Sequence, residues 1–207
     1  MVHRLSIAIF DLYLRCLTIR HYCLFRYAIL QKKRAYVLAS VVRRAFSDMQ
    51  AIQSVDIKFV PKMGYTACTD YKIAWEAPVV FAIWDADRPL FGMAIEFQPG
   101  VLSIRQLQGV AGVHMREIAP DWTQRLVKAC IRFARLTGIK TVRLYHADQR
   151  LSYYIPWYTE PVDDPERKRQ ELRRRLRAIY DGTGRKLGLR RMKNWSEWIN
   201  PNRARIP

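Results

Sequence analysis

Between Val79 and Tyr145 the chain changes from short apolar runs to a helical spacing of apolar residues, and then back to an apolar run. Three apolar runs come first, separated by polar turns at residues 85–89 and 98–100. The second turn contains Pro99 and Gly100. Proline presets one backbone dihedral and glycine tolerates positive φ, so this pair suits the two central positions of a type II turn. The stretch therefore predicts a three-stranded antiparallel meander.

A helix is predicted next, from Pro120 to Thr137. Its apolar residues recur mostly every three or four positions and would share one face: Trp122, Leu126, Cys130, Phe133 and Ala134. Asp121 stands where the helix dipole favours a carboxylate, and Gly138 stands where a C-cap glycine is expected. Residues 139–145 then form a strand. Because a strand, a helix and a returning strand make a crossover, part of the sheet should be parallel, and we predict a mixed α/β (α+β) fold with a central mixed sheet flanked by helices.

Residues 1–50 form a basic, apolar segment without glycine or proline, and we expect it to be helical. Its polar residues are spaced so that they would share one narrow stripe: Arg4, Asp11, Arg15, Tyr22, Arg26 and Lys33. The segment could be one or two helices packed on the core, or a basic amphipathic helix that meets a membrane or a partner, or a targeting segment. Residues 51–207 are predicted to form one α/β domain, with a loop and a basic helix at about 147–180.

The charge balance favours a polyanionic partner. The chain has 36 Lys and Arg residues against 18 Asp and Glu, a formal net charge of +18. Such a bias suits nucleic acid or a nucleic-acid-bound protein, an acidic membrane surface or a phosphate-rich cofactor. Two clusters would meet phosphates: a ridge on the central helix (Arg125, Lys128, Arg132 and Arg135) and the last long helix (Arg173, Arg174, Arg175 and Arg177). Aromatic residues of the preceding loop could stack on bases beside them: Tyr153, Tyr154, Trp157 and Tyr158.

The cysteines favour an intracellular, cytoplasmic protein. Cys16, Cys23, Cys68 and Cys130 show no CxxC spacing and lie mostly in apolar surroundings. This pattern predicts buried, reduced thiols, with neither a metal site nor a disulfide framework. The sequence also lacks an uninterrupted apolar stretch of about 18 residues, the length that a transmembrane helix needs.

Two short motifs flank the predicted crossover. Residues 106–111 read Gln-Leu-Gln-Gly-Val-Ala, and residues 185–189 read Arg-Lys-Leu-Gly-Leu. The former motif fits the Q/R-x-x-G-x-G/A pattern and the latter is similar to the end of a Tyr-x-x-x-Gly-Phe pattern, so the chain from about Val79 to Trp198 resembles the GNAT acyltransferase superfamily. The resemblance implies that backbone amides near Gln106, Gly109, Ala111 and Gly112 cradle the pyrophosphate of acyl-CoA, and that the acyl acceptor is an amine.

The resemblance also implies groups for proton transfer, although the chain departs from the family pattern. Residues 112–119 separate the glycines from the helix, and Gly184 stands where the proton-donating tyrosine is often found. Tyr180, one turn earlier, is the expected replacement, and Glu96 or His146 would serve as the general base. Two functions follow. One is an N-acyltransferase that uses acyl-CoA; the other is an inactive GNAT-like fold that acts as a basic nucleic-acid-binding or ribonucleoprotein assembly module.

Overall fold

The computed structural model describes residues 32–50, 52–59, 77–110, 113–149 and 164–201. Several sequence expectations lie outside these ranges. They concern most of the N-terminal segment, three of the four cysteines, Ala111 and Gly112, the aromatic residues at 153–158, and the end of the chain.

The described strands form one sheet in the order β1-β2-β3-β4-β5-β7-β6. Their bounds are β1 (Ser54–Phe59), β2 (Val79–Asp85), β3 (Arg88–Gln98), β4 (Val101–Gly109), β5 (Thr141–Tyr145), β6 (Arg190–Arg191) and β7 (Trp195–Ile199). β2, β3 and β4 form the predicted antiparallel meander, and Gly100 has the positive φ of 71° that the turn between β3 and β4 requires. β4 and β5 are parallel, so the predicted crossover is confirmed.

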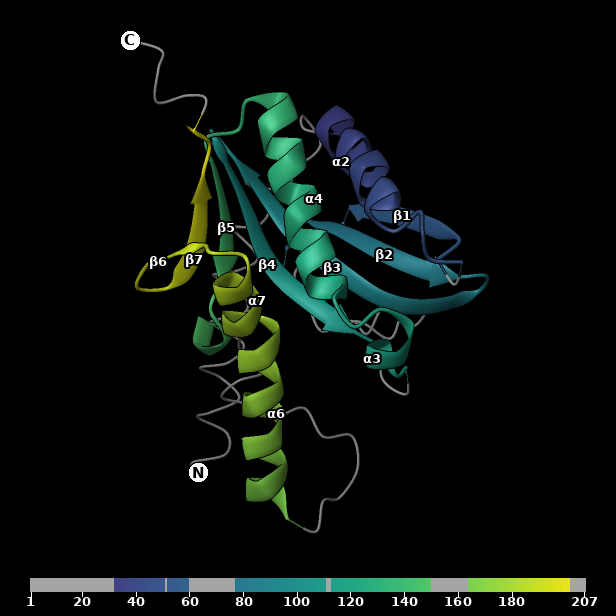
Figure 1. Cartoon of the computed structure of the whole chain (residues 1–207), viewed down its shortest axis with the longest axis vertical. Helices are drawn as coiled ribbons and strands as arrows, with labels where there is room; N and C mark the ends of the chain where they lie inside the picture. Colours follow the sequence, from purple (N-terminus) through teal and green to yellow (C-terminus); the bar gives the residue numbers. More distant parts are fainter. Residues whose placement is uncertain (1–31, 51, 60–76, 111–112, 150–163, 202–207) are drawn as a thin grey trace, which may run out of the picture.

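The helices in the described ranges are α2 (Lys32–Ala45), α3 (Met115–Ile118), α4 (Trp122–Thr137), α6 (Pro165–Ile179) and α7 (Asp181–Lys186), with the 3-10 turn η1 (Ala147–Gln149) after β5. α4 buries its whole predicted apolar face, and Gly138 ends it in the left-handed conformation. α2 and α4 lie side by side across one face of the sheet (Figure 1). The mixed α+β fold is therefore confirmed, with a sheet whose pairs are mostly antiparallel.

The main hydrophobic core lies between this face of the sheet and the two helices. Aromatic rings connect the sheet with both helices, because Phe91 of β3 contacts both Phe46, just after α2, and Trp122 of α4, with ring centroids 5.2 and 5.0 Å apart. Burying such large side chains is the dominant favourable contribution to folding. Buried side chains of residues 32–46 are thus part of the domain core. The end of the N-terminal segment therefore packs on the domain.

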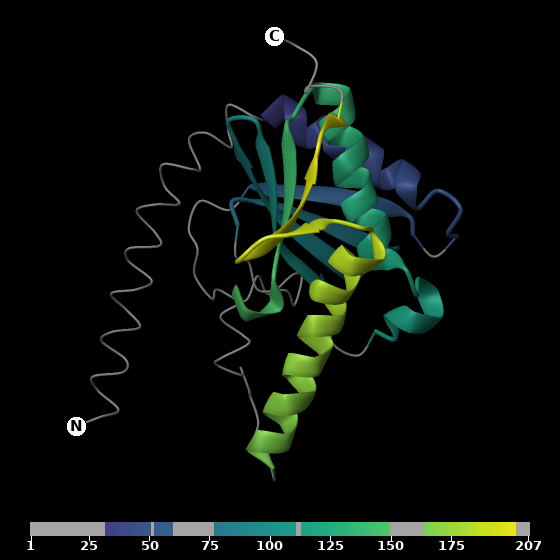
Figure 2. The same cartoon turned by 60° about the vertical axis from the view of Figure 1, so that its left-hand side comes forward.

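α6 differs from α2 and α4 because it extends away from the sheet (Figure 2). Its start follows capping rules: the Asp164 carboxylate accepts a hydrogen bond from the Arg167 backbone N–H at 3.0 Å, and Pro165 occupies the first turn. Leu172, Leu176 and Ile179 on its apolar side are only half-buried, and α6 has no buried residue. Within the described ranges, none of the helices combines the length and the apolar character needed to cross a membrane.

Candidate functional site

The parallel strands β4 and β5 pair only along part of β4. Their register runs from Val101 to Ile104, whereas β4 continues to Gly109. Beyond this point the hydroxyl of Tyr180 contacts the backbone of Leu107: it accepts from the N–H at 2.9 Å and donates to the carbonyl oxygen at 3.1 Å. Tyr180 is 1% exposed. Its hydroxyl therefore satisfies buried backbone groups where β5 has ended.

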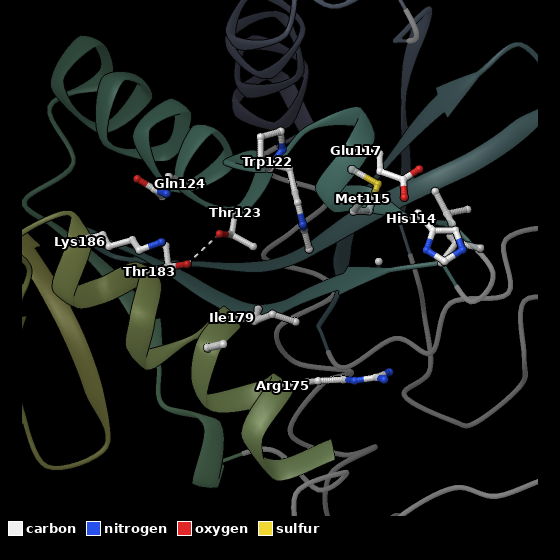
Figure 3. A pocket seen from close by; sticks show the side chains of 15 residues that line it. His114, Met115, Glu117, Trp122, Thr123, Gln124, Arg175, Ile179, Thr183 and Lys186 are labelled. Carbon is white, nitrogen blue, oxygen red and sulfur yellow. Dashed lines mark hydrogen bonds between the residues drawn. The ribbon is translucent and has the colours of Figure 1, made fainter. Parts of the chain in front are cut away.

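A pocket of about 780 Å³ opens beside this point. It lies at the carboxyl end of β4, where the chain enters α3 and α4, and α6 and α7 form its opposite wall (Figure 3). Its lining includes Gly109, Val110, Val113, His114, Met115, Glu117, Pro120, Trp122, Thr123, Gln124, Arg175, Ala178, Ile179, Thr183 and Lys186. In sheets with crossover connections, ligands commonly bind beyond the carboxyl ends of the strands.

The pocket offers several groups that favour an anion. α4 begins at the pocket, and its N-terminal end carries a partial positive charge from the helix dipole. The Trp122 N–H donates to the Ala119 carbonyl oxygen at 3.1 Å, so the N–H groups of Thr123 and Gln124 are the first-turn donors available to a ligand. Arg175 and Lys186 are exposed and supply cationic side chains from α6 and α7. The hydroxyls of Thr123 and Thr183, 2.8 Å apart, connect α4 with α7 across the pocket (Figure 3).

Two titratable side chains stand on the wall formed by α3, which faces α6 and α7. His114 and Glu117 belong to the stretch that carries α3, and Figure 3 shows both at the pocket, where both are exposed. This stretch is the one that separates the phosphate motif from the long helix, and the sequence predicted no helix within it. The structure gives it a short helix whose side chains line the pocket.

The candidates for proton transfer do not meet at the pocket. Tyr180 is held at Leu107, next in sequence to the pocket residue Ile179. His146 is 3% exposed, and its Nε2 lies 3.1 Å from the Ser196 hydroxyl. Ser196 lies directly against α7, because a Cβ added to Gly184 would stand 2.9 Å from the Ser196 hydroxyl. The same close approach leaves no room for a tyrosine at position 184.

Glu96 occupies a different part of the sheet. It is 1% exposed and accepts a hydrogen bond from the Gln98 amide, and its Oε2 lies 3.9 Å from Nε of Arg105. Its partner across the strands is Ser103, near the start of β4, whereas the pocket lies at the end of β4. Glu96 therefore belongs to a polar cluster of the sheet.

The predicted phosphate motif meets the pocket at Gly109. This residue lines the pocket, and a Cβ there would be 3.6 Å from Cγ of Met115. Gln106 is 3% exposed and donates through Nε2 to the Gln108 side-chain oxygen at 2.6 Å, so its side chain forms a hydrogen bond within β4. Ala111 and Gly112 lie outside the described residues.

Arg125, the first member of the expected basic ridge, connects two helices. Its Nη1 lies 2.6 Å from the Asp48 carboxylate and donates to the Ala45 carbonyl, and its Nε lies 2.9 Å from Asp121. The hydrogen bond from Arg125 lowers the pKa of Asp48 below its ordinary value. Arg125 therefore fixes α4 against the segment that follows α2, and its role in nucleic-acid binding stays a prediction.

The other basic residues differ in exposure. Lys128 and Arg135 are exposed on α4, Arg132 is also on its outer side, and the Arg135 guanidinium lies over the Trp198 ring, 5.4 Å from its centroid. On α6, Arg174 and Arg177 are exposed and Arg173 is half-buried. The exposed cations therefore remain on two separate helices.

Sequence patterns alone did not single out most of the pocket residues. Arg175 was one of several arginines on the same helix. Lys186 belonged to the motif at residues 185–189, but the resemblance gave it no role there. His114, Glu117, Thr123 and Thr183 carry no short-range signal, because their proximity depends on how α3, α4 and α7 pack. Within the described ranges, no three His, Cys, Asp or Glu side chains are grouped so that they could hold a metal ion.

No protein-family model matches the sequence, and a search of curated proteins finds no match either. Function is therefore inferred from the pocket and from the charged surfaces.

Proposed function

We propose that the protein is a GNAT-like N-acyltransferase that binds acyl-CoA in this pocket and transfers the acyl group to an amine. The observation that carries the proposal is the position of the pocket. It joins the carboxyl end of β4, the first turn of α4 and two cations on the facing helices. Helix N-termini with nearby cations favour phosphate groups, and coenzyme A carries a pyrophosphate and a further phosphate.

The lining fits a ligand of this type. A volume of about 780 Å³ is in the range of small-molecule sites. Thr123 and Gln124 stand in the first turn of α4, Lys186 lies beside them, and the Arg175 side chain extends toward the side of the pocket where His114 lies (Figure 3). Apolar side chains, including Val113, would accommodate less polar parts of the ligand.

The reaction needs a positioned amine and two proton transfers. The amine nitrogen forms a bond to the acyl carbon, the carbon–sulfur bond breaks, and the thiolate takes a proton. His114 and Glu117 are the titratable groups on the pocket wall that could accept the amine proton. Tyr180, beside Ile179, would donate to the thiolate if its hydroxyl exchanged Leu107 for the ligand.

The proposal is tested first by ligand-dependent thermal stability. Acetyl-CoA and desulfo-CoA should both raise the melting temperature, because a ligand at about 100 times its Kd stabilises the folded state by about 2.7 kcal/mol. The double variant Arg175→Glu/Lys186→Glu should lose this response, because both cations become carboxylates. Lys128→Glu/Arg132→Glu makes the same change in net charge on the outer side of α4 and should respond like the wild type.

The result separates binding from catalysis. Equal loss of response in both double variants would show a general charge effect and contradict a site in the pocket. Binding without release of free thiol from acetyl-CoA, over a panel of primary amines and polyamines, would contradict the transferase. Where thiol is released, Tyr180→Phe should lower kcat and alter the pH profile of kcat if the hydroxyl donates the proton. A variant that loses stability but keeps the wild-type kcat would show that the Tyr180 hydroxyl has only a structural role.

A further inference from the structure

α6 presents a strongly basic surface that the pocket uses only at Arg175. The helix contains seven Lys and Arg residues against two Glu residues, and none of its residues is buried. Leu176 and Ile179 pack against the hydrophobic core, so the apolar side of the helix faces the domain. The basic side chains occupy the rest of the helix surface, where it extends away from the sheet (Figure 2).

Four of these cations share one face of α6. Arg167 and Arg174 are seven residues apart, as are Lys168 and Arg175, and residues two helical turns apart lie on the same side of a helix. All four are exposed, and the Arg167 side chain is 77% exposed. Glu171 lies between the two pairs, with its Oε1 3.8 Å from Nε of Arg167. We call Arg167, Lys168, Arg174 and Arg175 the α6 track.

The dimensions of the track suit a duplex. Seven residues of α-helix rise about 10 Å, and the major groove of B-form DNA is about 12 Å wide. A helix that crosses this groove would place one pair of cations near each phosphate backbone. The deep, narrow major groove of A-form RNA does not admit a helix.

Two other anionic partners fit the track less well. Single-stranded nucleic acids are held by aromatic residues that stack on bases, and α6 contains no aromatic residue. Helices that lie on membranes insert an apolar face, whereas the apolar side of α6 faces the domain. We propose that α6 binds double-stranded DNA through phosphate contacts of the α6 track, independently of DNA sequence.

The test compares two triple variants in DNA binding. Arg167→Gln/Lys168→Gln/Arg174→Gln removes three cations of the track and keeps Arg175, so that the pocket retains its lining. Lys33→Gln/Arg43→Gln/Arg44→Gln removes three exposed cations from α2 and has the same net charge. Binding to a labelled duplex of about two helical turns is measured by fluorescence anisotropy over about 50–200 mM salt.

The expected result is a difference in salt dependence. Each lost phosphate contact lowers the slope of log Kobs against log salt by about 0.9, so the track variant should lose about 2–3 in slope, while the α2 variant keeps the wild-type slope. Equal slopes in the two variants, or wild-type binding without salt dependence, would overturn the proposal. So would tighter wild-type binding to a single-stranded RNA of equal length or to phosphatidylserine vesicles.

Folding is checked separately from binding. The three side chains of the track variant are exposed, and glutamine is a good helix former, so circular dichroism and the melting temperature should remain close to those of the wild type. If the triple variant is unfolded, Arg174→Gln against Arg44→Gln gives the same comparison, with an expected slope difference of about 0.9. Acetyl-CoA binding is measured on the same samples and should be unchanged, which keeps this proposal separate from the proposed function.

Discussion

At the scale of single residues, two turn positions have positive φ, and one is occupied by alanine and the other by glycine. Ala86, between β2 and β3, has φ of 50°, and Gly100, between β3 and β4, has φ of 71°. An L-residue in the left-handed region destabilises the folded state by about 1–2 kcal/mol. Glycine avoids this strain, but its greater conformational freedom in the unfolded chain reduces the gain by about 0.5–1 kcal/mol. Ala86→Gly should therefore raise the free energy of unfolding by roughly 0.5–1 kcal/mol, measured by urea denaturation.

The reverse change at the second turn is the matched control. Gly100→Ala should lower the free energy of unfolding by roughly the same 0.5–1 kcal/mol. A Cβ at Gly100 would stand 3.5 Å from Cδ of Lys140, an ordinary contact, so the loss comes from the backbone conformation rather than from a clash. Shifts of the same sign in both variants would show that φ does not determine the outcome.

At the scale of elements, the short helix α7 is constrained by one close approach to β7. A Cβ at Gly184 would lie 2.9 Å from the Ser196 hydroxyl and 3.1 Å from its Cβ. Gly184→Ala should therefore destabilise the fold by about 1–3 kcal/mol, because α7 must move away from the sheet. The displacement would also disturb the hydrogen bond between Ser196 and His146.

A neighbouring glycine of the same helix gives the opposite expectation. A Cβ at Gly182 would meet only the Arg177 carbonyl oxygen, at 3.6 Å. Gly182→Ala should be neutral or stabilise the fold by about 0.5–1 kcal/mol, since alanine is the better helix former. Thermal unfolding of both variants measures the difference, and equal effects at positions 182 and 184 would refute the packing explanation.

At the scale of the whole molecule, a row of polar residues crosses the sheet on five strands. The strand registers place it in the order Glu96, Ser103, Arg143, Glu197 and Arg190. Burial disfavours the ionised form of Glu197, but hydrogen bonds from Arg190 and Trp195 and the charges of Arg190 and Arg143 outweigh it, so its pKa lies below the ordinary value. This carboxylate connects β7 with β6 and β5.

The lowered pKa gives a pH dependence of stability. A carboxyl group with a depressed pKa in the folded state contributes its full stabilisation above the unfolded value of 4.5 and loses it as the pH falls through the folded pKa. Glu197→Gln should cost roughly 1.5–3 kcal/mol near neutral pH, because it removes hydrogen bonds to a charged group. The difference in melting temperature from the wild type should shrink below about pH 4.5.

A surface carboxylate serves as the control for this pH series. Glu166 on α6 pairs with Arg169 at 3.1 Å, and its side chain is 58% exposed. Exposed ion pairs contribute little to stability, so Glu166→Gln should change the melting temperature only slightly at any pH. A difference in melting temperature between Glu197→Gln and the wild type that stays constant across the pH series would show that the charge of Glu197 does not stabilise the row of polar residues.

The sequence by itself determined the elements whose signals are local. Three such signals are the apolar spacing of α4, the Gly138 cap and the Pro99-Gly100 turn. Each depends on residues within a few positions of one another, so local backbone geometry is enough to predict the element. The meander and the parallel crossover follow from the order of these elements. Charge counting likewise indicated basic surfaces, but not which of the cations already had partners within the chain.

Only the tertiary structure decided which distant side chains meet. Tyr180 binds the backbone of Leu107 across 73 positions, Arg125 reaches Asp48 across 77, and Thr123 meets Thr183 across 60. Such contacts depend on the angles at which helices pack on the sheet and on one another, and no spacing along the chain encodes those angles. The pocket and the Arg125 connection between helices therefore emerged from packing. Among the elements that build the pocket, β4, α4 and α6 were already present in the pattern of the sequence, whereas the short helix α3 was not.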